Sequence, residues 1–120
     1  MHLKISLRIM DGDGEKVFGS GVVELLRKIE ETGSLNRAAR SMDLAYSKAW
    51  KILAAAEKRL GITFIERTIG GAHGGGSRLT DEGRDFLERY EKFDRRVRRQ
   101  AEDEFAVAFP EWKKDAERET

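Results

Sequence analysis

The stretch from Gly33 to Gly61 constrains the fold of this 120-residue chain more than any other part. Apolar residues recur there at helical spacing in two short segments, 34–42 and 46–60, separated by three or four residues. Ser34 stands where it can cap the first segment, and Gly61 stands where a helix commonly ends. Two short amphipathic helices joined by so brief a turn predict a helix-turn-helix.

A strand, loop and strand pattern follows this motif. Residues 62–69 have a strand pattern, residues 70–77 are rich in glycine, and residues 78–80 return as a second strand. We therefore expect a β-hairpin, the wing of a winged helix-turn-helix. Its glycines suit either close backbone approach to a DNA phosphate or minor groove, or a hairpin tip without a partner. The loop lacks the lysine of a nucleotide-phosphate motif, so nucleotide binding is not expected.

The residues before the motif predict a short β segment and one more helix. Apolar and polar residues alternate over 3–9, an Asp-Gly turn follows at 11–14, and residues 16–18 form a short returning strand. A helix over 20–32 is expected, with Ser20 as its N-cap and Gly33 at its end.

Thr80 or Asp81 is expected to cap a long final helix over residues 81–109, which Pro110 ends. Its large apolar residues recur every three or four positions and form a stripe. A domain about half as long as this helix cannot cover the whole stripe, since each residue advances a helix by about 1.5 Å. We therefore expect a homodimer that covers Phe86, Tyr90, Phe93, Val97 and Phe105. The alternative is a distal helix that folds back or frays.

The net charge of +1 hides a separation of charge along the chain, because residues 35–79 contain eight basic and three acidic residues. On an ideal helix over 46–60, four residues lie opposite the apolar face: Ser47, Lys51, Ala54 and Lys58. Lys48 lies at one edge of this face, with Tyr46 and Trp50 nearer the core. Such a face suits insertion into the major groove of DNA. Lysines alone could simply solvate an exposed face, but the turn and the hairpin favour DNA contact.

Several other classes of function are not supported. The chain has no cysteine, so it forms neither disulfides nor thiolate metal sites. His2 and His73 have no partner at metal-ligand spacing, and no grouping of side chains suggests catalysis or a cofactor. No apolar run approaches membrane-spanning length. We therefore expect a soluble, cytoplasmic protein that is not an enzyme.

Four segments carry a resemblance to a known family: Gly33-Ser34-Leu35-Asn36-Arg37-Ala38-Ala39, Ala45-Tyr46-Ser47-Lys48-Ala49-Trp50, Glu66-Arg67-Thr68-Ile69-Gly70-Gly71 and Gly74-Gly75-Gly76-Ser77-Arg78-Leu79-Thr80-Asp81-Glu82-Gly83. Over about residues 19–93 the chain resembles the DNA-binding domain of ModE-type molybdate-responsive transcription regulators. The Ala-Trp pair joined to the glycine-rich wing is fairly specific to that family. The helix-turn-helix alone would equally resemble LysR-type regulators.

The resemblance implies a dimeric winged-helix protein that binds a palindromic operator through the helix from Tyr46 and the wing. Ala45 stands where the family usually has a capping serine, and the order Ser47-Lys48 is reversed, so the base contacts do not transfer. Family members that sense molybdate carry oxyanion-binding modules after this domain, whereas this sequence stops at Thr120. No molybdate pocket is therefore expected. Any effector would be sensed by a separate protein or by a surface of the dimer.

Together these patterns predict a mainly α fold with a small β component. We expect a winged helix-turn-helix DNA-binding domain with an N-terminal β segment over 1–80, a dimerisation helix over 81–109 and a charged tail over 110–120. The expected function is a transcription regulator whose partner is double-stranded DNA. The alternatives are an architectural DNA binder of low specificity and a protein-interaction module. The expected DNA contacts are Ser34, Asn36, Arg37, Tyr46, Ser47, Lys48, Trp50, Lys51, Arg67, Gly74, Gly75, Ser77 and Arg78.

Overall fold

The structure is a computed structural model that describes residues 2–68 and 76–112. The chain divides into two compact units. The helix-turn-helix unit is Arg8–Glu88, and the tail unit combines Met1–Leu7 with Arg89–Thr120. We describe each unit by itself.

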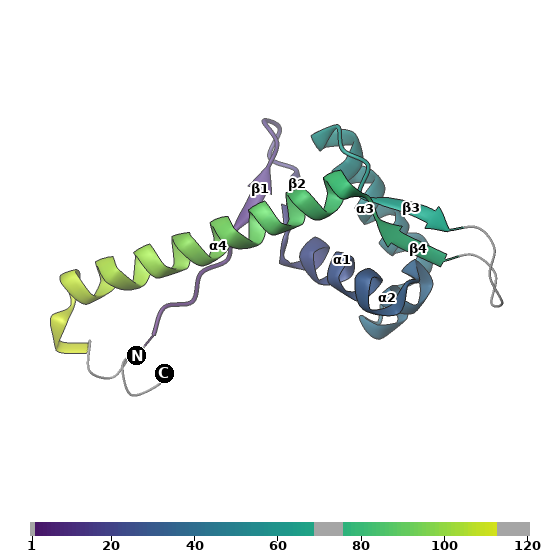
Figure 1. Cartoon of the computed structure of the whole chain (residues 1–120). Coiled ribbons are helices and arrows are strands. Elements are labelled where there is room, and N and C mark those ends of the chain that lie inside the picture. The colour runs from purple at the N-terminus through teal and green to yellow at the C-terminus, as the bar shows by residue number, and fades with distance from the viewer. Residues whose placement is uncertain (1, 69–75, 113–120) are drawn as a thin grey trace. The chain divides into compact units, whose positions relative to one another are not determined.

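Two short strands precede three helices, and a second pair of short strands precedes a long final helix (Figure 1). The elements in order are β1 (Arg8–Met10), β2 (Lys16–Gly19), α1 (Ser20–Thr32), α2 (Leu35–Ser41), α3 (Tyr46–Leu60), β3 (Ile65–Thr68), β4 (Gly76–Leu79), α4 (Asp81–Ala108) and a 3-10 turn (Pro110–Trp112). β1 pairs with β2 and β3 pairs with β4, both antiparallel. The predicted fold class, mainly α with a small β component, is confirmed.

The helix boundaries follow the predicted signals closely, with one exception. Gly33 and Gly61 end α1 and α3 in left-handed conformations, with φ of 70° and 68°. These values suit glycine because it has no Cβ to clash with the following carbonyl. The prediction of Ser20 as an N-cap is wrong. Ser20 is already helical, and Gly19 precedes it without any side-chain capping bond.

The strands differ more from their predicted extents. The alternating pattern over 3–9 predicted a long strand, but β1 contains only residues 8–10. A strand extends only as far as a partner supplies hydrogen bonds, and β2 has four residues. In the wing, β4 begins at Gly76, two residues before the predicted start, because Gly76 pairs with Thr68. Residues 69–75 lie outside the described part of the chain.

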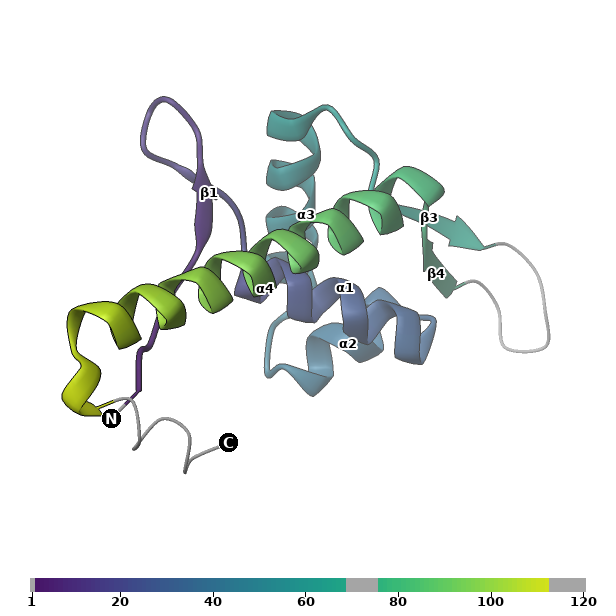
Figure 2. The same cartoon turned by 60° about the vertical axis from the view of Figure 1, so that its left-hand side comes forward.

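The three helices of the motif bury one apolar core in the helix-turn-helix unit. Figure 2 shows α3 running across the pair formed by α1 and α2. Leu25, Leu26 and Ile29 of α1 are fully buried. Three aromatic rings from β2, the segment before β3, and α4 close the other side of this core. Phe18 lies 5.7 Å from Phe64 and 4.8 Å from Phe86, between ring centroids.

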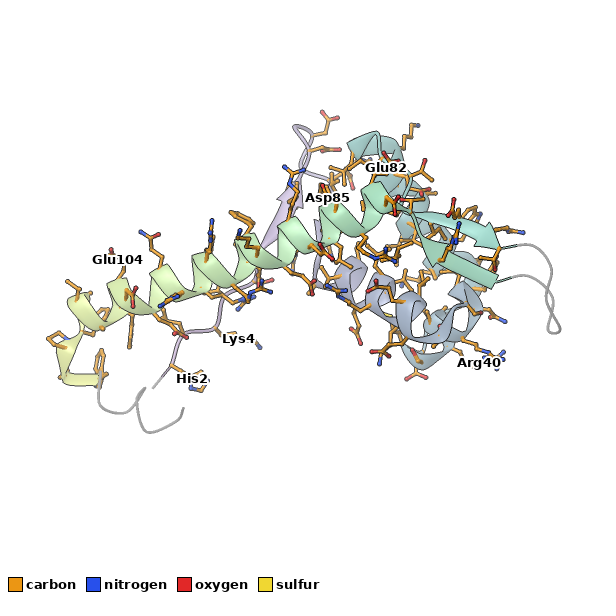
Figure 3. The ribbon with its side chains drawn as sticks, in the orientation of Figure 1. His2, Lys4, Arg40, Glu82, Asp85 and Glu104 are labelled. Carbon is orange, nitrogen blue, oxygen red and sulfur yellow. The ribbon has the colours of Figure 1, made fainter. Side chains whose placement is uncertain are left out.

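The start of α4 is fastened to the residues before β3. The Gly83 amide donates to Thr80 Oγ1 at 2.9 Å, so Thr80, of the two predicted candidates, caps the helix. The Thr80 hydroxyl donates to the Thr63 carbonyl. The Thr63 amide donates to Glu82 Oε1 at 2.7 Å, and Glu82 is labelled in Figure 3 at the start of α4. These bonds join the wing to the final helix.

The turn between β1 and β2 is joined to the end of α3. Asp11 Oδ1 accepts hydrogen bonds from the Asp13 and Glu15 amides, which closes the predicted Asp-Gly turn. Arg59 Nε donates to Asp11 Oδ2 at 2.7 Å. The Arg59 guanidinium, together with these backbone donors, holds the pKa of the Asp11 carboxyl below its ordinary value.

The tail unit contains residues 89–108 of α4 and the segment before β1. The Tyr90 hydroxyl donates to the Leu7 carbonyl at 2.9 Å, and burial is the main cause that raises the pKa of Tyr90. α4 ends at Ala108, close to the predicted boundary, and Pro110 opens the 3-10 turn. Phe105, Phe109 and Trp112 form a cluster with ring centroids 5.1–6.3 Å apart.

We expect Gly83→Ala to destabilise the protein. A Cβ at this position would lie 2.5 Å from the Phe64 carbonyl oxygen, which is backbone and cannot turn aside. Overpacking of this kind costs about 1–3 kcal/mol, more than the gain of about 1 kcal/mol that alanine brings to a helix. Urea unfolding measures the difference. In the control Gly21→Ala, a Cβ meets nothing closer than Lys16 Nζ at 3.9 Å. A Gly83→Ala protein as stable as Gly21→Ala would contradict this packing.

Candidate nucleic-acid interface

α3 has a buried face and an opposite face that is open to solvent. Ala49, Leu53 and Ala56 are fully buried or nearly so, as the helical spacing predicts. The four residues predicted on the opposite face, Ser47, Lys51, Ala54 and Lys58, are all exposed, and so is Lys48. We call these five residues the basic face. The buried side is made of small and medium side chains, which brings α3 close to the rest of the unit.

The turn before α3 is held by its own hydrogen bonds. The Arg37 amide donates to Ser34 Oγ at 3.1 Å, which confirms Ser34 as the N-cap of α2. The Leu44 amide donates to the Ala39 carbonyl at 2.9 Å, so the chain turns sharply after α2. Asp43, in this turn, has a φ of 55°. Aspartate is one of the few residues besides glycine that adopts this conformation readily.

Exposed polar side chains also lie on α2. Asn36 and Arg37 are exposed near its start, as expected of DNA contacts. Arg40 is exposed near its end and projects outward in Figure 3. The two arginines add positive charge to the helix-turn-helix motif, and Asn36 adds a neutral hydrogen-bonding group.

Two aromatic residues at the start of α3, expected nearer the core boundary, are partly exposed. Tyr46 and Trp50 keep 43% and 42% of their surface accessible. The Tyr46 hydroxyl accepts a long hydrogen bond, 3.5 Å, from Arg67 Nη2 of β3. Arg67 is therefore next to the start of α3, and the two sequence-predicted regions, helix and wing, meet at this pair.

The wing is fixed to the helix-turn-helix by a backbone contact that sequence reasoning missed. The Ser77 amide of β4 donates to the Gly33 carbonyl at 2.8 Å. The two backbones come so close that a Cβ on Gly76 would lie 2.5 Å from the same oxygen. The Gly76 amide donates to Thr68 Oγ1 at 2.8 Å. The sequence shows Gly76, but nothing in the sequence indicates that its backbone lies against the Gly33 carbonyl.

Arg78 is less available to a ligand than its sequence position implied. Its Nε donates to Glu66 Oε1 across the wing at 2.7 Å, and the side chains are 69% and 46% exposed. An ion pair this exposed contributes little stability, but the carboxylate cancels part of the charge of the arginine. The predicted contacts Gly74 and Gly75 lie outside the described residues.

Two other kinds of site are absent from the described residues. No cluster of three or more histidine, cysteine, aspartate or glutamate side chains there could hold a metal ion. None of the helices described has the length and apolar character needed to cross a membrane. The basic face and the base of the wing are thus the groups on which a functional assignment depends.

The sequence matches the family described as bacterial regulatory helix-turn-helix protein, lysR family, over residues 22–84, more than half of the chain. The chain belongs to this family. Its helix-turn-helix is therefore that of a DNA-binding transcription regulator. The matched residues include most of α1 and the whole of α2, α3 and the wing, so the basic face of α3 lies within the match.

Relatives of this LysR-family chain include two proteins named ModE. The transcriptional regulator ModE of Haemophilus influenzae is 37% identical over 73 residues, 61% of this chain and 29% of that protein. The molybdenum transport protein ModE of Azotobacter vinelandii is 35% identical over 81 residues, 68% of this chain and 30% of that protein. The chain thus spans less than a third of these relatives, and the ModE resemblance predicted from the motifs is confirmed for the helix-turn-helix region.

Solved structures support the same fold. A crystal structure of CbnR_DBD in a complex with DNA matches 73% of this chain and 95% of that chain, with a TM-score of 0.54 and 23% identity. A LysR family transcriptional regulator matches with a TM-score of 0.53 and 23% identity, over 73% of this chain and 28% of its own. At this identity the likeness concerns the fold, which is the predicted winged helix-turn-helix.

Proposed function

We propose that this protein binds a palindromic DNA operator as a homodimer and regulates transcription from it. The observation that supports this most directly is the basic face of α3 lying beside the base of the wing. Lys48 and Lys51 are exposed on that face, and Arg67 reaches Tyr46 at its start. The proposal implies a cytoplasmic protein, because its DNA partner lies there.

The chemistry of the basic face fits a major groove. Lysine ammonium groups donate to phosphates and to guanine edges, and a serine hydroxyl donates to or accepts from any base. Ala54 is exposed on the same face and adds no bulk that would hold the helix away from DNA. Trp50, with 42% of its surface open, offers an apolar plane for a sugar or a thymine methyl group.

A homodimer is supported by apolar surface on the tail unit. Of the five side chains expected at a dimer contact, Phe86 packs against Phe18 and Phe64 inside the helix-turn-helix unit, so it is used within the chain. Tyr90 is buried, with 7% of its surface exposed. Phe93 is half exposed, at 50%. Because half of the Phe93 surface is already covered, leaving the other half in water forgoes about 1 kcal/mol of burial, which a second copy would recover.

If the basic face contacts DNA phosphates, the affinity for DNA should depend strongly on salt concentration. Lys51→Ala removes one phosphate contact, so every duplex should bind less tightly and the slope of log affinity against log salt should become shallower by about 0.9. Glu66→Gln frees Arg78 and should tighten binding. Fluorescence anisotropy on a labelled duplex measures both. Arg99→Ala, which removes an exposed cation of the tail unit, serves as the control and should leave the slope unchanged.

Bound genomic fragments, sequenced after a shift assay, show whether the binding is specific. Trp50→Ala or Ser47→Ala should change which sequences are preferred, because the proposal assigns base contacts to these side chains. Loss of all binding in excess random DNA would instead favour a low-specificity architectural protein. A protein that binds no duplex at low salt would favour a protein-interaction module and overturn the proposal.

The dimer proposal predicts that two charges on the apolar stripe separate the subunits. The variant Phe93→Glu, Val97→Glu should sediment as a monomer at micromolar concentration, because each glutamate would be buried unpaired in the contact. Arg95→Glu, on the opposite side of α4, is the matched control and should stay dimeric. A monomeric parent, or a dimeric double variant, would show that this helix is not the interface.

A further inference from the structure

The helix-turn-helix unit contains a cleft of about 600 Å³ between β2, the start of α1 and one side of α3. Its floor is apolar and includes Val22, Met42, Leu44 and Ile52. This volume lies within the range of about 300–1,000 Å³ that is typical of small-molecule sites. All residues that line the cleft belong to the helix-turn-helix unit, so the cleft depends on that unit alone.

Three lysines line the same cleft: Lys16 of β2, and Lys48 and Lys51 of α3. Within the described part of the chain, no acidic side chain lines it. Among the described residues, none of these three ammonium groups makes a hydrogen bond or an ion pair. Like charges that converge on one cleft repel one another, so an anion placed between them is favourable.

An apolar floor beneath three cations is suited to a ligand with an apolar body and one anionic head. We propose that this cleft binds a small apolar carboxylic acid, with the carboxylate among the three lysines and the carbon chain against Met42 and Ile52. A DNA phosphate could pair with the lysines but has no apolar group to cover the floor. A neutral lipid could cover the floor but has no charge to pair with the lysines. The carboxylic acid can do both.

Such a ligand would oppose DNA binding, a consequence that rests on the proposed function. Lys48 and Lys51 belong both to the cleft and to the basic face. A carboxylate held beside them neutralises charge that DNA phosphates would otherwise meet. The DNA-binding unit would then sense an apolar acid directly, without a separate sensing protein.

Octanoate and 1-octanol form a matched pair of probes, since they share the chain and differ in charge. With ¹⁵N-labelled full-length protein and no DNA, octanoate should cause saturable amide shifts at Val22, Met42, Leu44 and Ile52. Ten heavy atoms of a ligand support a dissociation constant of about 1 mM or below. Octanol should bind more weakly. Shifts scattered over other apolar surface, no shifts, or octanol binding as tightly as octanoate would overturn the proposal.

Two variants distinguish a lysine that lines the cleft from a lysine that only adds positive charge to the protein. Lys16→Gln should weaken octanoate binding by about threefold or more, because it removes one of three cations from the cleft. Lys58→Gln, on the same α3 face but outside the cleft, should leave octanoate binding unchanged. Ala55→Leu narrows the cleft from within and should also weaken binding, while circular dichroism shows that the helices persist. Equal effects of Lys16→Gln and Lys58→Gln would contradict the assignment.

The effect on DNA is measured in the same titration series by anisotropy. Octanoate should lower the affinity of the parent protein for DNA at constant ionic strength, and Lys16→Gln should need more octanoate for the same loss. Ligand binding without any loss of DNA affinity would refute the coupling. Absence of DNA binding in every condition would refute the proposed function. The amide shifts caused by octanoate would still show whether the cleft binds the carboxylic acid.

Discussion

Burial of one face of α3 is the constraint on which the rest of this structure depends. Ala49, Leu53 and Ala56 are buried, and their small volume lets the helix pack closely against α1 and α2. Burying this face turns the opposite side of the helix away from the core, and the residues on that side are exposed. The position of Lys51, and hence the chemistry open to DNA, follows from where the alanines are buried.

Direct contacts also join the wing to the helix-turn-helix. Gly33 ends α1 and also accepts the Ser77 amide of β4, so the turn that begins the motif also anchors the hairpin. Arg67 then reaches Tyr46 at the start of α3. Positive charge is distributed unevenly between α3 and the wing. Among the described residues, no acidic side chain lines the cleft of Lys48 and Lys51, whereas Arg78 is paired with Glu66. The strongest positive potential should therefore lie on α3 rather than on the wing.

Local signals predicted most of the helices, because a cap, a C-terminal glycine and apolar spacing all act within a few residues. The bounds of α3, the capping role of Ser34 and the exposed side of α3 were predicted in this way. Contacts between distant segments were not predictable. The short extent of β1 depends on β2, and the close approach of Gly76 to the Gly33 carbonyl depends on how the wing packs. Phe86 was expected at a dimer contact, although it packs on Phe18. Lys16 was not predicted as a binding residue, because only the fold brings it into the same cleft as Lys48.

The most direct test of the account is a map of the DNA contact on the intact chain. Amide signals of ¹⁵N-labelled protein are followed while a short duplex, taken from bound genomic fragments, is added at low salt. The account predicts that the largest shifts occur from Tyr46 to Lys51 and from Gly76 to Arg78, with smaller shifts at Asn36 and Arg37. Shifts concentrated on the β1–β2 hairpin or on α4, with the start of α3 unchanged, would contradict it.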